Sequence, residues 1–193
     1  MKNNAGFSLV ELIVVILIIG IISGGAAMSV SVLYNADVNR AGKYLTTIMS
    51  QAREKAVSQD ADGSSTISVE ITKDSEGDYY AKILQSTVSS SGGVDTTTVT
   101  ELSSQKLGSY RMSLYFGPKN STDSNRVLLV NAADSTDGTH ATTQRVVYTF
   151  SKSTGGLEVT GGIAGQDSLD IIVAGSQTVK IIVVPVTGRC YVQ

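Results

Sequence analysis

The hydrophobic pattern of the chain begins with a long apolar stretch over residues 7–28. Glu11 is its single charged side chain, and the run from Leu12 to Ile22 contains only aliphatic residues and Gly20. As a helix rising about 1.5 Å per residue, the stretch would be roughly 33 Å long, enough to cross the hydrocarbon core of a bilayer. We therefore predict a transmembrane helix over residues 7–28.

A one-sided helical pattern follows over residues 29–59. Apolar residues recur there at spacings of three and four, as on one face of a helix packed against a core: Val38, Ala41, Leu45, Ile48, Ala52 and Ala56. Proline, which breaks helices, does not occur between Phe7 and Asp60. The pattern predicts one continuous helix from Phe7 to Gln59, about 80 Å long.

The remainder, residues 60–193, has the pattern of a β-rich domain. Short stretches rich in β-branched and aromatic residues alternate with Gly, Ser, Asp and Asn, which favour turns. We predict strands at 66–71, 79–84, 94–102, 110–116, 126–130, 145–150, 170–173, 179–184 and 189–192. The predicted fold class is α+β, with the long helix packed across one face of an antiparallel sheet.

Composition narrows the possible functions. The chain has 193 residues and a net charge of −2, which does not suit a strongly basic nucleic-acid-binding protein, and no specific nucleic-acid site is evident. One Cys, one His and no Trp argue against a disulfide scaffold, a His/Cys metal site and most nucleophile–base catalysis. We predict a non-enzymatic protein without a metal or cofactor.

Glu11 is the residue that most needs an explanation. A carboxylate in an apolar segment costs a few kcal/mol and usually has a function. Lys2 and Arg40 are too far along the helix to pair with it. Its partner is therefore either water at the headgroups or a group outside this chain. A secretory signal ending near Ser23–Ala27 is an alternative interpretation, but Glu11 interrupts its apolar core and the helical pattern continues beyond Ala27.

The segment Ala5–Leu12, with the sequence AGFSLVEL, resembles the class III signal of type IV prepilins and type II secretion pseudopilins. The resemblance implies that residues 1–6 are a leader, that prepilin peptidase cuts between Gly6 and Phe7, and that Phe7 becomes the N-methylated terminus. It also implies that Glu11 neutralises the N-terminal amine of an adjacent subunit during assembly.

The same resemblance implies where the protein acts and with which partners. The N-terminus stays in the cytoplasm while the polar domain is translocated across the cytoplasmic membrane. After processing, the subunit joins an extracellular or periplasmic filament. The implied partners are other pilin subunits, prepilin peptidase, and the assembly platform with its ATPase.

Three glycines, Gly20, Gly24 and Gly25, lie inside the predicted rod. Each costs about 1 kcal/mol relative to Ala in a helix interior. They allow three interpretations: close approach of neighbouring helices, a weak point where the helix stretches during assembly, or no role. The proline that kinks this helix in the family is absent here.

Other residues carry weaker signals. The acidic segments Asp60–Ser64 and Asp74–Asp78 suggest turns more than calcium loops, and Asn120 begins a sequence that fits a glycosylation sequon. His140 is expected on an exposed loop, and Cys190 as a buried thiol, with an intersubunit disulfide as the alternative. Residues 89–93 and 120–125 are expected to be exposed loops, hence candidate adhesive surfaces.

The sequence thus predicts four regions: a leader (1–6), a transmembrane or filament-core helix (7–28), an amphipathic helix (29–59) and a β-rich extracytoplasmic domain (60–193). The leading function is a structural filament subunit. The alternative is a minor pilin or pseudopilin that primes or tips a fibre, since Ala52–Val57 and Ile181–Arg189 resemble H-type minor pseudopilins. A membrane-anchored enzyme or binding module is the remote alternative.

Overall fold

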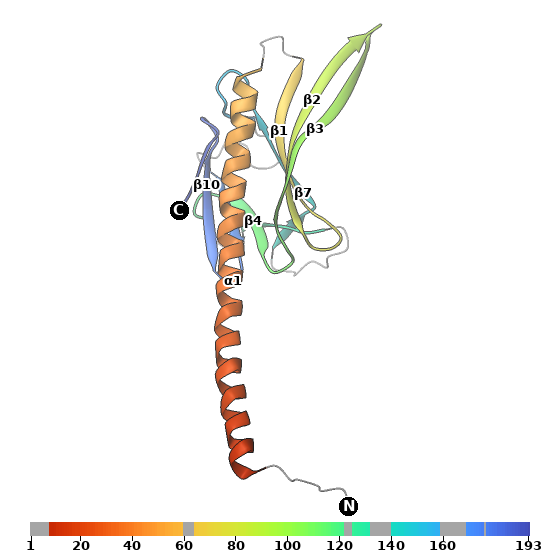
Figure 1. Cartoon of the computed structure of the whole chain (residues 1–193). Helices are drawn as coiled ribbons and strands as arrows, with labels where there is room; N and C mark the ends of the chain where they lie inside the picture. Colours follow the sequence, from red (N-terminus) through yellow and green to blue (C-terminus); the bar gives the residue numbers. More distant parts are fainter. Residues whose placement is uncertain (1–7, 60–63, 122–124, 132–139, 159–168, 176) are drawn as a thin grey trace, which may run out of the picture.

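The computed structural model describes residues 8–59, 64–121, 125–131, 140–158, 169–175 and 177–193, and it gives no side-chain surroundings for 25–35. It consists of one long helix, α1, and a body of β-strands packed around the C-terminal half of that helix (Figure 1). The N-terminal half of α1 extends away from the body as a bare rod.

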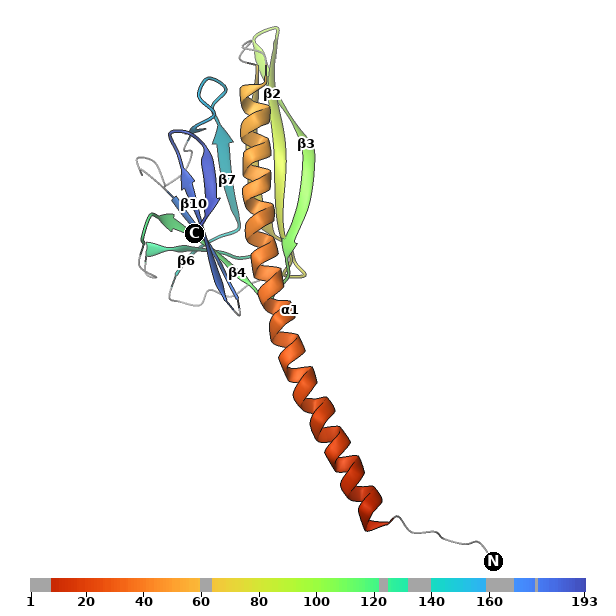
Figure 2. The same ribbon diagram turned by 60° about the vertical axis from the view of Figure 1, so that its left-hand side comes forward.

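Helix α1 runs from Leu9 to Val57 without interruption, close to the predicted bounds. Ser8 occupies the N-cap position in an extended conformation, and the chain leaves the helix at Ser58. Figure 2 shows that the helix curves gently where it leaves the body but does not break. The absence of proline from this segment explains its continuity.

The predicted core-facing stripe of α1 is confirmed. Its members are at most 4% exposed, and Met49, which the spacing did not include, is buried with them: Val38, Ala41, Leu45, Ile48, Met49, Ala52 and Ala56. These side chains are short or unbranched at Cβ with few exceptions, so the helix lies close to the strands beneath it. The stripe joins the C-terminal half of the rod firmly to the body.

The predicted membrane span is not confirmed. Within the part of the chain that the structure describes, no helix is both long enough and apolar enough to cross a membrane. Of the predicted span, Phe7 lies outside the described residues, and the side chains of residues 25–28 are likewise not described.

The strands form two sheets, where the sequence predicted a single antiparallel sheet. The first sheet has the order β3-β2-β1-β7-β8, and all its pairs are antiparallel. Its strands are β1 (Ser65–Lys73), β2 (Tyr79–Ser91), β3 (Val94–Gly108), β7 (Arg145–Phe150) and β8 (Leu157–Glu158).

The second sheet has the order β11-β10-β9-β4-β5-β6. Its strands are β4 (Ser113–Pro118), β5 (Val127–Leu129), β6 (Ala141–Thr143), β9 (Leu169–Ala174), β10 (Thr178–Val184) and β11 (Arg189–Val192). Strands β5 and β6 pair in parallel, which corrects the all-antiparallel prediction. The chain enters this sheet at β4, returns to the first sheet at β7, and re-enters at β9, so the two sheets are interleaved in sequence.

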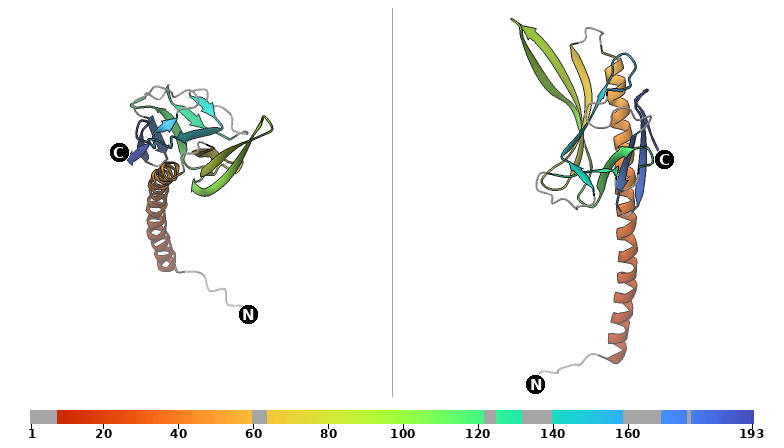
Figure 3. Two further views of the ribbon diagram at one scale, coloured as in Figure 1. Left: turned by 90° about the horizontal axis from the view of Figure 1, so that it is seen from above. Right: turned by 180° about the vertical axis from the view of Figure 1, so that it is seen from behind.

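The core lies where α1 meets both sheets. Seen from above, the helix occupies the junction between them (Figure 3). Buried residues of β1 and β9, such as Ile71 and Ile171, belong to the same cluster as Leu45 of the helix. Phe116 of β4 and Tyr148 of β7 bring their rings to 6.5 Å and connect the two sheets directly. Burial raises the pKa of the Tyr148 hydroxyl well above its ordinary value.

Candidate functional site

The N-terminal half of α1 presents apolar side chains around its whole circumference. The large apolar residues between Leu9 and Ile22 are 48–75% exposed, and this stretch extends beyond the β-strands (Figure 1). Exposed apolar surfaces of this size usually mark sites that contact a membrane or another protein. The rod is therefore a candidate contact surface.

Glu11 lies in the first turn of α1 and is exposed. Its carboxylate is near the N-terminal end of the helix, where the backbone N–H groups of the first turn point. The ion pairs found among the described residues all lie in the β-body, and Glu11 takes part in none of them. A cation from outside the described chain could therefore reach the carboxylate from most directions.

The glycines of the rod leave room on its surface. A Cβ atom added at Gly20 or Gly24 would meet no atom within 4 Å. Gly25 belongs to α1, but its surroundings are among the parts not described. Gly6 and Phe7, the residues of the predicted cleavage site, also lie outside the described residues.

Comparison with known proteins decides the nature of this segment. Residues 1–27 match the family model described as the prokaryotic N-terminal methylation motif. The chain carries a class III prepilin signal. This signal supports membership of the type IV pilin and pseudopilin family, which is structural and not known for catalysis. Searches of the curated proteins and of the solved structures gave no match.

The prepilin signal and the exposed rod are one continuous feature. The matched residues include the first part of α1, from Leu9 to Ala27, and thus the apolar surface and Glu11. The sequence identified this segment correctly, because a single charge in a long apolar run is visible without any tertiary information. The β-body has no counterpart among the matched residues.

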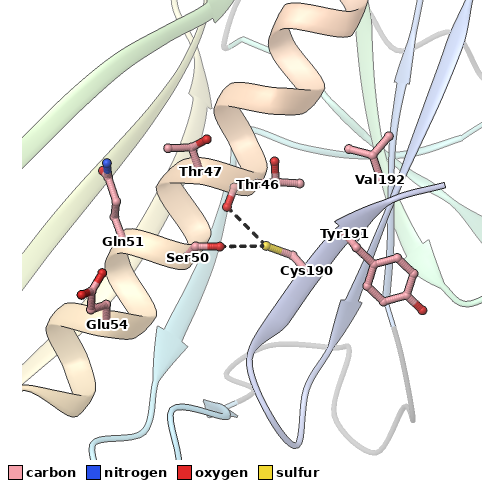
Figure 4. A pocket seen from close by; sticks show the side chains of 8 residues that line it. All are labelled: Thr46, Thr47, Ser50, Gln51, Glu54, Cys190, Tyr191 and Val192. Atoms are coloured by element: carbon pink, nitrogen blue, oxygen red, sulfur yellow. Dashed lines mark hydrogen bonds between the residues drawn. The ribbon is translucent and has the colours of Figure 1, made fainter.

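Cys190 of β11 lies in a shallow groove between that strand and α1 (Figure 4). Its thiol donates to the backbone oxygen of Thr46 at 3.4 Å, and its sulfur is 3.9 Å from the Ser50 hydroxyl oxygen. The predicted burial is thus only partly correct, since the residue is half-buried. Burial raises the pKa of this thiol, which makes it a weak nucleophile near neutral pH.

The acidic segment Asp74–Asp78 forms a turn, as predicted. One carboxylate oxygen of Asp74 accepts hydrogen bonds from the backbone amides of Glu76 and Asp78, both at 2.9 Å, and Gly77 adopts a positive φ of 88°. The carboxylates of Asp74, Glu76 and Asp78 lie within 4.8 Å of one another. Lys106 pairs with Asp78, and this contact raises the pKa of the lysine. Of the other acidic segment, residues 60–63 lie outside the described part.

The sequence analysis missed a buried ion pair beside Asn120. Asp170 of β9 is 1% exposed. Its carboxylate pairs with the Lys180 ammonium at 2.9 Å and accepts a hydrogen bond from the backbone N–H of Asn120 at 2.7 Å. Lys180 also donates to the Asn120 side chain at 3.1 Å. The pairing depends on β9 and β10 being neighbours, which no local pattern encodes. The glycosylation sequon at Asn120 includes Thr122, outside the described residues.

His140 and the predicted loops need correction. His140 is half-buried, with its ring 5.1 Å from that of Tyr115, so it is not a free loop residue. Residues 89–91 belong to β2, and only Gly92 and Gly93 form a turn, although the whole segment is exposed as predicted. Ser121 is buried, which excludes it from an adhesive surface.

Proposed function

We propose that this chain is a structural subunit of a type IV pilus or a pilus-like filament. The chain is inserted in the cytoplasmic membrane with its N-terminus inside, cut after Gly6 by prepilin peptidase, and methylated at Phe7. Subunits then assemble through α1. The observation that carries the proposal is the prepilin signal, which continues directly into a rod with exposed apolar side chains on all sides.

The chemistry of Glu11 supports this proposal. Cleavage after Gly6 creates a new amine on Phe7, which is a cation at the start of an apolar rod. Two opposite charges can be taken out of water together only when they are paired. An amine from one subunit and Glu11 from its neighbour would meet this condition when the rods dock, so unpaired or misplaced subunits would be excluded from the bundle.

The division of the chain into regions follows the same logic. We assign residues 1–6 as leader, 7–28 as the membrane and filament-core segment, 29–59 as the helix that holds the body, and 60–193 as the outer domain. The rod and the body contact different neighbours, so the contacts are head-to-tail and can repeat without closing. A helical fibre is the natural product.

The mature N-terminus tests the proposal directly. Mass spectrometry of the protein from its native membrane should find a chain that begins at Phe7 with one added methyl group. Gly6→Leu should retain the leader and fail to assemble. A mature chain beginning near Ala26 or Met28 would show a secretory signal and contradict the proposal.

Subunit stoichiometry separates a main subunit from a minor one. We propose the main structural role, for which the chain should account for most of the mass of the purified fibre. A trace amount, located at one fibre end, would instead show the minor, priming role. The partners that we propose for assembly are those implied by the prepilin signal: other pilins, the peptidase, the platform and its ATPase.

A further inference from the structure

The β2–β3 hairpin extends beyond the rest of its sheet. Strand β1 pairs with β2 only as far as Ser65, opposite Thr87, whereas β2 and β3 stay paired to Ser91 and Val94. The end of the hairpin is therefore a two-stranded ribbon that projects from the body, on the side away from the bare rod (Figure 1). All residues from Val88 to Leu102 are exposed.

An isolated two-stranded ribbon is only marginally stable in water. Here it is also rich in residues that favour strands and poor in charge: between Val88 and Thr100 the single charged side chain is Asp95, and proline is absent. Natural edge strands usually carry lysine, proline or a bulge that blocks further pairing. Of these features the ribbon has only a bulge, at Leu102, where the register of β2 and β3 shifts.

Strand β3 is the outermost strand of its sheet and is 15 residues long. The turn at its start, Gly92–Gly93, has two residues and positive φ at both, as in a type I′ turn. Such a turn closes on a hydrogen-bonded pair, here Ser91 and Val94, so the backbone groups of Asp95, Thr97, Val99 and Glu101 point to the outer edge. Among the described strands, none pairs with that edge.

The charges along this edge are compatible with a second copy of the same strand in one particular register. We propose that β3 pairs antiparallel with β3 of another copy of this chain, with Val99 opposite Val99. In this register Glu101 faces Thr97, Asp95 faces Ser103, and Thr98 faces Thr100, so no like charges are opposed. A register centred on Thr98 would oppose Asp95 and Glu101 and is disfavoured. The two five-stranded sheets then form one continuous sheet.

This contact has a defined symmetry. The two-fold axis of an antiparallel strand pair is perpendicular to the sheet, and α1 lies along the face of the sheet. The rods of the two copies therefore point in opposite directions. An isologous contact closes after two copies. It thus cannot be one of the repeated contacts within a polar filament, and it joins copies in separate filaments or in facing membranes.

A cysteine at the centre of the contact tests its register. In the full-length chain with Cys190→Ser, purified in detergent, Val99→Cys should give a disulfide-linked dimer on mild oxidation. Opposed residues in a hydrogen-bonded pair have Cα atoms about 5.5 Å apart, within the range that a disulfide bridges. Ser89→Cys, on β2 of the same ribbon and also exposed, is the matched control and should stay monomeric.

Charge gives a second test that needs no oxidation. Val99→Lys places two ammonium groups opposite each other and should abolish the dimer in sedimentation experiments. Val88→Lys should leave the dimer intact, because Val88 lies on the neighbouring strand and not at the proposed contact. It is a matched control, since Val99 and Val88 are similarly exposed (58% and 45%). Equal crosslinking of Val99→Cys and Ser89→Cys, no crosslinking of Val99→Cys, or a persistent Val99→Lys dimer would each overturn the proposal. None of these results depends on processing at Gly6.

Discussion

At the scale of single residues, two carboxylates of this chain differ in both exposure and pairing. Glu11 is exposed on an apolar rod and is not paired within the described residues, whereas Asp170 is buried and bound by Lys180. The first is easily recognised from the sequence, because one charge in a long apolar run stands out. The second appears in the sequence as the start of an ordinary strand, and its importance depends on the neighbouring strand.

The Asp170–Lys180 pair should contribute to the stability of the body. Breaking a buried pair by removing one partner costs several kcal/mol, and Lys180 is 25% exposed, which reduces the cost. We expect Asp170→Asn to lower the free energy of unfolding by about 2–3 kcal/mol, measured by urea denaturation.

A surface pair provides the matched control. Lys82 and Glu101 are 3.0 Å apart but 34% and 45% exposed, so Glu101→Gln should cost less than about 1 kcal/mol. The double variant Asp170→Asn with Lys180→Met should recover part of the loss, since no buried charge is left unpaired. Equal losses for Asp170→Asn and Glu101→Gln would contradict this assignment.

At the scale of elements, α1 is one helix with two different surroundings. Its position was predictable, because a spacing of three and four residues is encoded locally and proline is absent. The strands were located at nearly the right places, but their partners were not. Pairing joins segments far apart in sequence, such as β4 with β9, and no periodicity reports it.

The lengths of β2 and β3 were also underestimated, for a related reason. Their outer parts are exposed on both faces, so they lack the alternation of apolar and polar residues that marks a half-buried strand. The strands β6 and β8 were missed because they have only three and two residues and, unlike β5, none of those residues is fully buried. The sequence thus indicates a strand best where that strand contributes to the core.

The two halves of α1 should respond differently to the same substitution. Leu45 is fully buried against the sheets, and Leu45→Ala should lower the free energy of unfolding of the body by about 2–5 kcal/mol. Leu17 is exposed on the bare half, and Leu17→Ala should change that free energy by less than about 0.5 kcal/mol. Similar losses at both positions, measured by urea denaturation, would show that the rod is packed against the body.

At the scale of the whole molecule, the surface that we propose builds the filament is separate from the surface that the body exposes. The prepilin signal and the apolar rod lie at one end, and the β2–β3 ribbon projects at the other. The fold class was predictable as α+β, but the division of the strands into two interleaved sheets was not. That division depends on how the strands of both sheets pack against α1, which is tertiary information.

The assembly role that we propose for Glu11 belongs to this scale, because its proposed partner is in another subunit. We expect Glu11→Ala to be processed at Gly6 and to remain stable, but to be lost from filaments, since the Phe7 amine would be buried without a counter-ion. Filament yield measured by shearing and immunoblotting checks this.

Glu54→Ala is the control for that experiment, because Glu54 is also an exposed glutamate of α1 but lies beside the body. It should assemble normally. Wild-type filament yield from Glu11→Ala would disprove the ion-pair mechanism.

The position of α1 between the two sheets has a mechanical consequence. In the proposed filament, tension would pull on each subunit along the axis of its rod. The buried stripe from Val38 to Ala56 runs parallel to that pull and contacts both sheets, so the load is applied in shear across all of its turns at once. Peeling would break these contacts one after another, whereas shear must break them together. The contact between α1 and the body should therefore withstand a much larger force along the helix axis than a force that peels the strands away from the helix.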